Sequence, residues 1–275
     1  MKLLITGATG FIGKNICQRL IQEKINFSCI TRESSDKSFF LLNKINYFDF
    51  DGDIGMLIKH MNFEEFTGVI HLASLYVTQH KEGQLENLIV SNILFGTQIL
   101  EASMHAKIPW FLNTGTCWQH YQGEDYNPVN LYAASKQGFE SMARYYAEAH
   151  DINFITIKLN DTYGLGDTRK KIFNLWQESS KTGGQLLMSP GDQLIDIVNI
   201  DTVTDKYLKL INLLSNSHAQ YNLASFVISS GREISLKQLA KEYEIQNKVK
   251  LNIVWGGRAY RDREVMVPKC KGYKL

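Results

Sequence analysis

The chain alternates between short apolar runs and longer segments that carry apolar residues on one helical face. The short runs are rich in β-branched and aromatic residues, which is typical of buried strands. The predicted strands cover residues 2–6, 26–31, 45–48, 69–72, 110–113 and 153–159. Helices are predicted between them, notably over residues 11–23, 85–105 and 132–150. This alternation predicts βαβ units and a parallel sheet with helices on both faces.

After about Gly164 the pattern breaks into shorter pieces separated by turn signals at residues 182–184, 189–191 and 229–231. A chain of 275 residues is long enough for one large α/β domain with a small lobe. We therefore predict a doubly wound parallel sheet built mainly from residues 1–164. Residues 165–275 are predicted to form a small C-terminal α/β lobe that interleaves with the sheet.

The first predicted strand runs directly into three glycines, Gly7, Gly10 and Gly13, and then into a helix. Glycine at such a turn tolerates positive φ and lets the backbone approach a pyrophosphate, whose charge the helix N-terminus favours. This arrangement predicts a dinucleotide-binding turn on a Rossmann-type sheet. The spacing Gly-x-x-Gly-x-x-Gly differs from the commonest fingerprint, Gly-x-Gly-x-x-Gly. The alternative is a glycine-rich turn that binds no ligand.

Charge and hydropathy exclude several classes of partner. The chain has 30 Lys and Arg against 28 Asp and Glu, a net charge of +2, which gives no broad field for nucleic acid or an anionic membrane. No apolar run approaches the roughly 20 residues that cross a bilayer, and the N-terminus lacks a signal-peptide pattern. We therefore expect neither a nucleic-acid nor a membrane partner.

The four cysteines, at positions 17, 29, 117 and 270, stand singly. Their spacing matches neither a metal site nor a disulfide framework. We therefore expect no metal site, no disulfide framework and a reducing, cytoplasmic location.

Tyr132 and Lys136 stand four positions apart at the start of a predicted helix, so their side chains share one face. An ammonium about 4 Å from a phenolate stabilises it by roughly 4 kcal/mol at an effective dielectric constant of 20, which lowers the pKa of the phenol by about three units. The pair therefore predicts a tyrosine acid–base catalyst, provided that desolvation of the phenolate does not cancel the gain. A threonine at the end of the preceding strand could hold a carbonyl oxygen. Alternatively, Tyr132 only packs and Lys136 is a solvated charge.

Several segments together resemble the extended short-chain dehydrogenase/reductases of the nucleotide-sugar epimerase/dehydratase type, over nearly the whole chain. The segments are TGATGFIG at 6–13, HLAS at 71–74, SNILFGT at 91–97, YAASK at 132–136, NDTYGLGD at 160–167, QLIDIVNIDTV at 193–203 and YNLAS at 221–225.

The resemblance implies a role for each matching residue. The diphosphate of the cofactor would lie on Gly7, Gly10, Phe11, Ile12 and Gly13; the adenine would meet Asp53 and Ile54; and Leu72, Ala73 and Asn92 would line the ribose and nicotinamide. Tyr132 would exchange the proton, and Lys136 would bind the nicotinamide ribose and lower the pKa of Tyr132. Thr114 would be the catalytic threonine, with Thr116 as its rival and as a substrate contact.

The choice of cofactor depends on the end of the second strand. NAD enzymes place a carboxylate there, whereas an arginine suits the 2′-phosphate of NADP through charge-assisted bonds. Arg32 stands at this place, with hydroxyls at Thr31, Ser34 and Ser35 beside it, which favours NADP(H). Glu33 follows directly, so NAD(H), with Arg32 as a solvated charge, stays the alternative.

The substrate side departs from the family pattern. Ile195 replaces the arginine expected in the QLID segment, and Asp161 takes the place of a common asparagine. Asn160 and Asp161 are expected substrate contacts. Because a sugar nucleotide needs a cationic clamp that Ile195 does not provide, Arg261 is the first candidate for its diphosphate and Arg263 the second. Either arginine could instead be a surface charge.

The resemblance implies NADP(H)-dependent reduction of a nucleotide-diphospho-4-keto-6-deoxy sugar in deoxysugar biosynthesis. The segments LYAASK, NDTYG and REVM resemble CDP-dideoxysugar synthases in particular. The alternatives are an NAD-dependent nucleotide-sugar 4-epimerase and, in another class, a non-catalytic NADP-binding regulator. Family analogy also implies a homodimer formed through the helices near 85–105 and 132–150.

Overall fold

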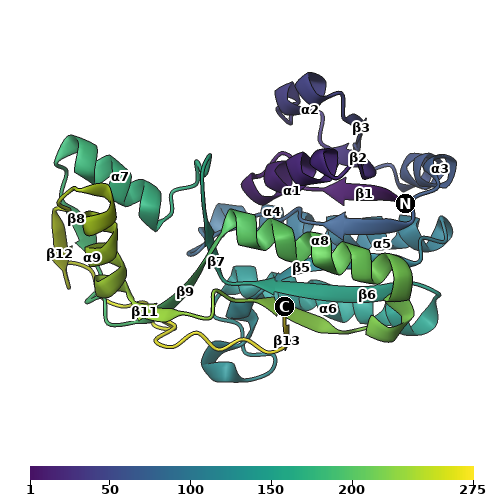
Figure 1. Cartoon of the computed structure of the whole chain (residues 1–275). Helices are drawn as coiled ribbons and strands as arrows, with labels where there is room; N and C mark the ends of the chain where they lie inside the picture. Colours follow the sequence, from purple (N-terminus) through teal and green to yellow (C-terminus); the bar gives the residue numbers. More distant parts are fainter.

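A parallel sheet forms the centre of the larger lobe (Figure 1). The structure is a computed structural model and describes all 275 residues. The eight strands of the sheet are β1 (Lys2–Thr6), β2 (Asn26–Thr31), β3 (Asn46–Asp49), β4 (Gly68–His71), β5 (Trp110–Thr116), β6 (Asn153–Leu159), β10 (Ser225–Ile228) and β13 (Tyr273–Lys274). Their order is β13-β10-β6-β5-β4-β1-β2-β3, and every neighbouring pair is parallel. The predicted Rossmann-type doubly wound sheet is confirmed.

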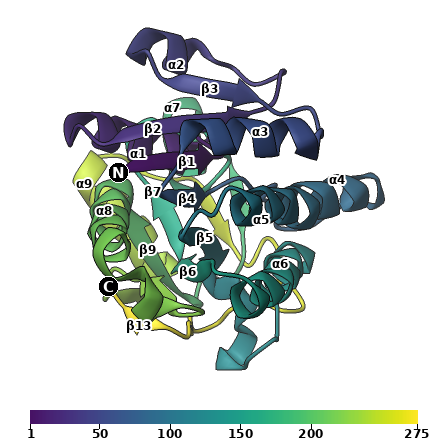
Figure 2. The same cartoon turned by 90° about the vertical axis from the view of Figure 1, so that its right-hand side faces the viewer.

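Helices cover both faces of this sheet (Figure 2). The helices α1 (Phe11–Gln22) and α8 (Ile200–Ser217) lie on one face, and α3 (Ile54–Glu64), α5 (Phe95–His105) and α6 (Leu131–Ala149) lie on the other. Successive residues of a strand point to opposite faces. Leu3 and Ile5 accordingly belong to the core under α1 and α8, whereas Leu4 belongs to the core under α3, α5 and α6. Burial on both faces explains why β1 reads as a continuous apolar run.

Two predicted elements differ from the structure in ways that bear on the site. Strand β5 continues to Thr116, three residues beyond its predicted end, and so carries both threonines within the sheet. The helix predicted over residues 85–105 consists of α4 (Leu85–Ile89), a π-helical turn η2 (Val90–Leu94) and α5. A π turn inserts an extra residue into a helix and is common at functional sites. Here it contains the buried side chain of Asn92.

The smaller lobe has two short sheets and two helices. Its elements are β7 (Asp161–Tyr163), β9 (Leu194–Asn199) and β11 (Glu233–Ser235), then β8 (Leu186–Met188) and β12 (Ile253–Trp255), with α7 (Ile172–Thr182) and α9 (Leu236–Asn247). A separate apolar cluster around Trp176 forms its core. Parts of the chain after residue 164, namely α8, β10 and β13, return to the larger lobe. The division at residue 164 stays a prediction. None of the helices is long and apolar enough to cross a membrane.

A disulfide joins Cys117, directly after β5, to Cys270 near the end of the chain. The prediction of no disulfide framework was wrong for this pair, while Cys17 and Cys29 are free and buried. The two bonded cysteines are 153 positions apart, and only the fold brings their Cα atoms to 4.9 Å. Beside the disulfide, Lys271 forms an ion pair with Asp125 at 3.0 Å. The last part of the chain is therefore tied to the loop that follows β5.

We expect the substitution Cys270→Ser to lower the free energy of unfolding by about 2–4 kcal/mol, because the disulfide restricts the unfolded chain across a long loop. Denaturant unfolding of the oxidised protein measures the effect. A reductant should lower the midpoint of the original protein and leave that of Cys270→Ser unchanged. Titration of four free thiols in the denatured, unreduced protein would contradict the disulfide.

Candidate active site

The turn between β1 and α1 is held by two close backbone approaches that exclude side chains. Gly7 has φ +73°, and a Cβ there would lie 2.5 Å from the amide nitrogen of Ala73. A Cβ on Gly13 would lie 2.3 Å from the carbonyl oxygen of Gly7. The N-cap of α1 is Gly10, and no side chain caps the helix. The first amides of α1 are therefore available to a ligand.

A small cavity of about 200 Å³ lies at the carboxyl ends of the central strands. Twelve of the predicted site residues line it: Gly7, Gly10, Phe11, Ile12, Gly13, Leu72, Thr114, Thr116, Tyr132, Lys136, Asn160 and Asp161. They come from segments that are far apart in the sequence. The structure brings them together at the edge where open α/β sheets bind their ligands.

Five of the predicted cofactor contacts lie outside this small cavity: Arg32, Asp53, Ile54, Ala73 and Asn92. Arg32 is exposed directly after β2, and its guanidinium forms no ion pair. Asp53 caps α3 by accepting a hydrogen bond from the amide of Met56 at 3.1 Å, and Ile54 begins that helix. Ala73 donates its amide to Thr6 Oγ1 at 3.3 Å, beside the glycine turn. Their cofactor contacts stay predictions.

Asn92 also lies outside the small cavity, and its side chain is fully engaged within the protein. Its Oδ1 accepts from the amide of Leu75 at 2.7 Å and from the hydroxyl of Ser74 at 3.2 Å. Its Nδ2 donates to the carbonyl oxygen of Leu75 at 3.1 Å and to Ser135 Oγ at 2.9 Å. In this structure Asn92 thus fixes the loop after β4 against the helix that carries Tyr132. A contact between Asn92 and the cofactor stays a prediction.

Tyr132 and Lys136 lie in the first turns of α6, whose N-cap Asn130 accepts the amide of Ala133 at 2.9 Å. Burial raises the pKa of Tyr132 to about 12, and the hydroxyl of Ser74 opposes the rise. The expected lowering of this pKa by Lys136 is not found here: burial disfavours the charged phenolate, and the charged groups that act on the phenol are Asp161 and Arg169. Burial also lowers the pKa of Lys136 to about 8. Tyr132 therefore keeps its proton at neutral pH.

The amine of Lys136 is buried and has no hydrogen-bond partner in the protein. Lys136 lines the small cavity, so its unpaired donor is placed to meet a ligand there. A buried donor without an acceptor is costly. This favours a ligand that offers hydroxyl or carbonyl oxygens.

The two threonines of β5 face the same side of the strand and differ in their partners. Thr114 Oγ1 lies 2.7 Å from the hydroxyl of Tyr207, which is fully buried on α8. Thr116 Oγ1 accepts the amide of Trp118 at 3.3 Å. Tyr207 was missed by the sequence analysis, because it is 93 positions from Thr114 and reads as an ordinary apolar position of a helix.

A large cavity of about 1150 Å³ lies between the two lobes. Arg261 and Arg263 both line it, and their contacts with a substrate stay predictions. Arg261 pairs with Glu264 at 3.0 Å, and its guanidinium carbon lies 5.6 Å from the ring centroid of Trp118. Ile195 also lines this cavity, so the position where the family has an arginine is apolar here.

Two further cations, which the sequence analysis missed, line both cavities. The guanidinium carbon of Arg169 lies 4.5 Å from the ring centroid of Phe11, in the glycine turn. Lys171 pairs with Asp161 at 2.5 Å, and its amine lies 4.8 Å from the ring centroid of Tyr76. The signal was the basic run at 169–171, which begins two positions after the end of the NDTYGLGD segment. These two side chains place positive charge where the cavities meet.

A partly buried carboxylate, that of Glu140, lies one helical turn beyond Lys136. Glu140 Oε1 accepts a hydrogen bond from Gln119 at 2.9 Å. The same oxygen lies close to Gly115 of β5, because a Cβ on Gly115 would be 3.1 Å from it. Burial raises the pKa of Glu140, and Lys158 opposes the rise. The charge of Glu140 in turn raises the pKa of Lys136 against the effect of burial. Glu140 therefore helps to keep Lys136 protonated.

Comparison with known proteins identifies the family of the chain. The model of the family described as the NAD dependent epimerase/dehydratase family matches residues 3–224. The CDP-abequose synthase of Salmonella typhimurium is 27% identical over 86% of this chain and 77% of the relative. The CDP-abequose synthase of Yersinia pseudotuberculosis is 26% identical over 98% of this chain and 93% of the relative. The UDP-glucose 4-epimerase of Thermotoga maritima, solved with UDP-glucose, has a TM-score of 0.81 at 19% identity, covering 99% of this chain and 90% of its own. This last likeness shows the fold.

We expect Glu140→Gln to lower the pKa of Lys136 below about 8, because the substitution removes the carboxylate that raises it. Around pH 7–8 a smaller fraction of Lys136 would then carry its proton. Titration of lysine ¹³Cε resonances by NMR measures this, with Lys136→Gln identifying the signal. Glu148→Gln is the matched control, since Glu148 lies on the same helix but is exposed and pairs with Arg144 at 2.8 Å. An unchanged titration in Glu140→Gln would contradict the coupling.

Proposed function

Because the chain belongs to the NAD dependent epimerase/dehydratase family, we propose that it reduces a nucleotide-diphospho-4-keto-6-deoxy sugar with NADPH, in deoxysugar biosynthesis. The observation that carries the proposal is the junction of the two cavities. Tyr132, Lys136 and Thr114 line the small cavity beside the glycine turn. Tyr76, Trp118, Asn160, Asp161, Thr162, Arg169 and Lys171 line both cavities, so a substrate in the large one can reach the proton donor.

Two observations support a nicotinamide cofactor in the small cavity. The glycine turn forms a cradle that a Cβ would fill, and the buried amine of Lys136 lacks an acceptor. The amides at the start of α1 would hold the diphosphate, and Lys136 would bind the ribose hydroxyls next to the nicotinamide. When bound, the reduced cofactor supplies the hydride that forms the new C–H bond at the keto carbon.

The residues of the chain would handle the oxygen of the same carbonyl. The hydroxyl of Thr114 would hold the oxygen while negative charge develops on it. Tyr132 would then transfer its phenol proton to that oxygen, which becomes the new alcohol, and Lys136 would stabilise the phenolate left behind. A pKa of about 12 keeps Tyr132 protonated in the free enzyme, which suits the proton donor of a reduction.

The cations around the large cavity support a substrate with a diphosphate. Arg261, Arg263, Arg169 and Lys171 all line this cavity. A guanidinium binds a phosphate through two parallel hydrogen bonds. Arg261 and Arg263 also lie on the segment that the disulfide fixes beside Trp118, so the diphosphate would be held at a set distance from the reacting carbonyl. Similarity to the CDP-abequose synthases supports a deoxysugar nucleotide.

The preference for NADPH rests on Arg32. This residue follows β2, where a carboxylate would serve NAD, and its exposed guanidinium has no carboxylate partner. A 2′-phosphate would supply that partner. NAD(H) remains the competing cofactor, because Glu33 is the next residue.

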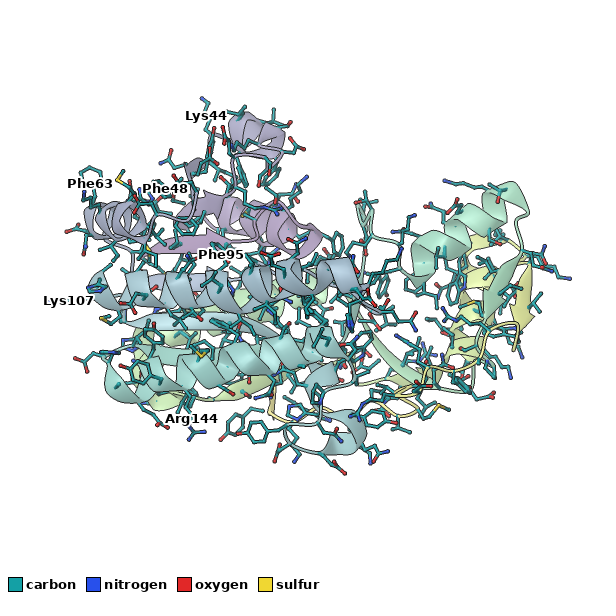
Figure 3. The ribbon with its side chains drawn as sticks, turned by 180° about the vertical axis from the view of Figure 1, so that it is seen from behind. Lys44, Phe48, Phe63, Phe95, Lys107 and Arg144 are labelled. Atoms are coloured by element: carbon teal, nitrogen blue, oxygen red, sulfur yellow. A yellow bond between two sulfur atoms is a disulfide. The ribbon has the colours of Figure 1, made fainter.

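We also propose that two copies of the chain associate through α4, η2 and α6. Exposed apolar side chains gather there: Leu85, Ile89, Val90, Leu94, Met142 and Tyr145. Seen from behind, α5 and α6 lie side by side, and Arg144 projects from α6 on this side of the molecule (Figure 3). A homodimer would bury these apolar residues.

We expect NADPH oxidation with at least one of the CDP-, dTDP-, GDP- and UDP-linked 4-keto-6-deoxy sugars. Tyr132→Phe should lower kcat by about 10²–10⁴-fold, because it removes the proton donor. Tyr273→Phe, which changes an exposed tyrosine, is the control. Net isomerisation of a sugar nucleotide without NADPH oxidation would identify a 4-epimerase instead. Unchanged turnover in Tyr132→Phe would contradict the assigned chemistry.

We expect Arg32→Ala to raise KM for NADPH by about 10–100-fold and to leave KM for NADH nearly unchanged, because only NADPH loses a charge-assisted bond. Steady-state kinetics with both cofactors measure the change. Arg19→Ala is the control, since Arg19 pairs with Asp205 at 3.0 Å, on the surface. Equal effects on the two cofactors would show that Arg32 does not read the 2′-phosphate.

A further inference from the structure

The phenol of Tyr207 is a buried polar group whose ring packs in the apolar core of the larger lobe. Tyr207 lies on α8 and is 0% exposed, within the core cluster that also contains Leu112, Ile157 and Ile228. Its hydroxyl has one partner in the protein, Thr114 Oγ1, at 2.7 Å. Thr114 Oγ1 in turn has no other partner than this hydroxyl. A pair of hydroxyls therefore links the apolar core to the small cavity.

The direction of this hydrogen bond follows from where each hydroxyl can find a second partner. The pair has two protons, and one of them lies between the two oxygens. If Thr114 donated, the proton of Tyr207 would be buried among apolar side chains without an acceptor, which is strongly unfavourable. Thr114 lines the small cavity, so its own hydroxyl proton can point into the cavity and bind an acceptor there. The favoured arrangement has Tyr207 donating and Thr114 accepting.

We infer that Tyr207 is a positioning residue, which donates its phenol proton to Thr114 Oγ1 and so leaves the Thr114 hydroxyl proton free to point into the small cavity. There the proton is available to the carbonyl oxygen that Tyr132 protonates. A hydroxyl that already accepts one hydrogen bond is also a better donor for the next. The expected effect of Tyr207 on catalysis rests on the proposed function. Its expected effect on stability depends only on the hydrogen bond with Thr114.

The same reasoning separates Thr114 from its rival. Thr116 accepts its hydrogen bond from the backbone amide of Trp118 and has no contact with Tyr207. A substitution at position 207 therefore acts on Thr114 and spares Thr116. If Tyr207 matters to turnover, Thr114 is the threonine that holds the substrate oxygen.

The kinetic test is Tyr207→Phe, which keeps the packed ring and removes the hydroxyl. We expect kcat to fall about tenfold, with KM for the sugar nucleotide and for NADPH unchanged, because the oriented donor acts on the developing oxyanion. Thr114→Val should lower kcat by about 10²–10³-fold, and Thr114→Ser should largely retain it. In the double variant Tyr207→Phe/Thr114→Val, kcat should equal that of Thr114→Val, since Tyr207 acts through Thr114.

Tyr146→Phe is the matched control, because Tyr146 is a buried tyrosine whose hydroxyl donates to Glu101 at 2.7 Å, on α6 away from the cavity. Its kcat should not change. Unchanged kcat in Tyr207→Phe, in an enzyme that Tyr132→Phe inactivates, would overturn the inference and leave the proposed function intact. If Tyr207→Phe raised KM about tenfold and left kcat unchanged, the inference would be overturned as well.

A stability test judges the pair without any substrate. Thr114→Val leaves the buried hydroxyl of Tyr207 without an acceptor, so we expect a lower denaturation midpoint than in the original protein. Adding Tyr207→Phe removes that stranded group, and the double variant should be more stable than Thr114→Val alone. Equal midpoints for Thr114→Val and the double variant would overturn the pairing, whether or not the proposed substrate is turned over.

Discussion

No side chain fits between the turn after β1 and the chain that follows β4. The Cβ of any residue at position 7 would lie 2.5 Å from the amide nitrogen of Ala73, and Gly7 also adopts positive φ. Because β1 and β4 are neighbours in the sheet, this contact fixes the glycine turn beside the loop that carries Ser74 and Tyr76. The second close approach, between Gly13 and the carbonyl of Gly7, holds α1 on the same turn. The glycine turn lines the small cavity, so the shape of that cavity depends on these two contacts.

Burial shifts the pKa values of two ionisable residues, Tyr132 and Lys136, that line the same cavity. It raises the pKa of Tyr132 and lowers that of Lys136, so each group is held closer to its neutral form than in water. Two side chains partly offset these effects of burial on the pKa values. The hydroxyl of Ser74 lowers the pKa of Tyr132, and the carboxylate of Glu140 raises the pKa of Lys136. The residues Lys136, whose amine is unpaired, and Thr114 both line the small cavity. The protein thus supplies donors that are already oriented before substrate arrives.

The last segment of the chain is joined covalently to the strand that carries Thr114. The disulfide between Cys117 and Cys270 joins the end of β5 to the segment that carries Arg261 and Arg263. Arg261 lies over Trp118, the residue next to Cys117. Because β5 also carries Thr114, a single strand connects the hydroxyl that would hold the carbonyl to the segment that would hold the diphosphate. The small lobe alone does not set this distance.

Local chemistry explains which features could be predicted from the sequence. Short apolar runs located six strands of the large sheet within a few residues, since strands such as β1, β2 and β6 are buried on both faces and are rich in apolar residues. The glycine turn and the Tyr132–Lys136 pair were also visible, because each depends on residues within one turn or one helix. Arg169 and Lys171 were present as a basic run, but their place at both cavities depends on how β7 leads away from β6.

The sequence by itself determined the parallel sheet, the glycine turn and the placement of Tyr132 and Lys136 on one helix, because short-range periodicity and spacing encode them. The tertiary structure decided the disulfide, the partnership of Thr114 with Tyr207, and the direction in which the pKa of Tyr132 shifts. The first two join residues 153 and 93 positions apart, and no local pattern links such residues. The third depends on desolvation, which is set by all the atoms that surround the phenol once the two lobes have folded.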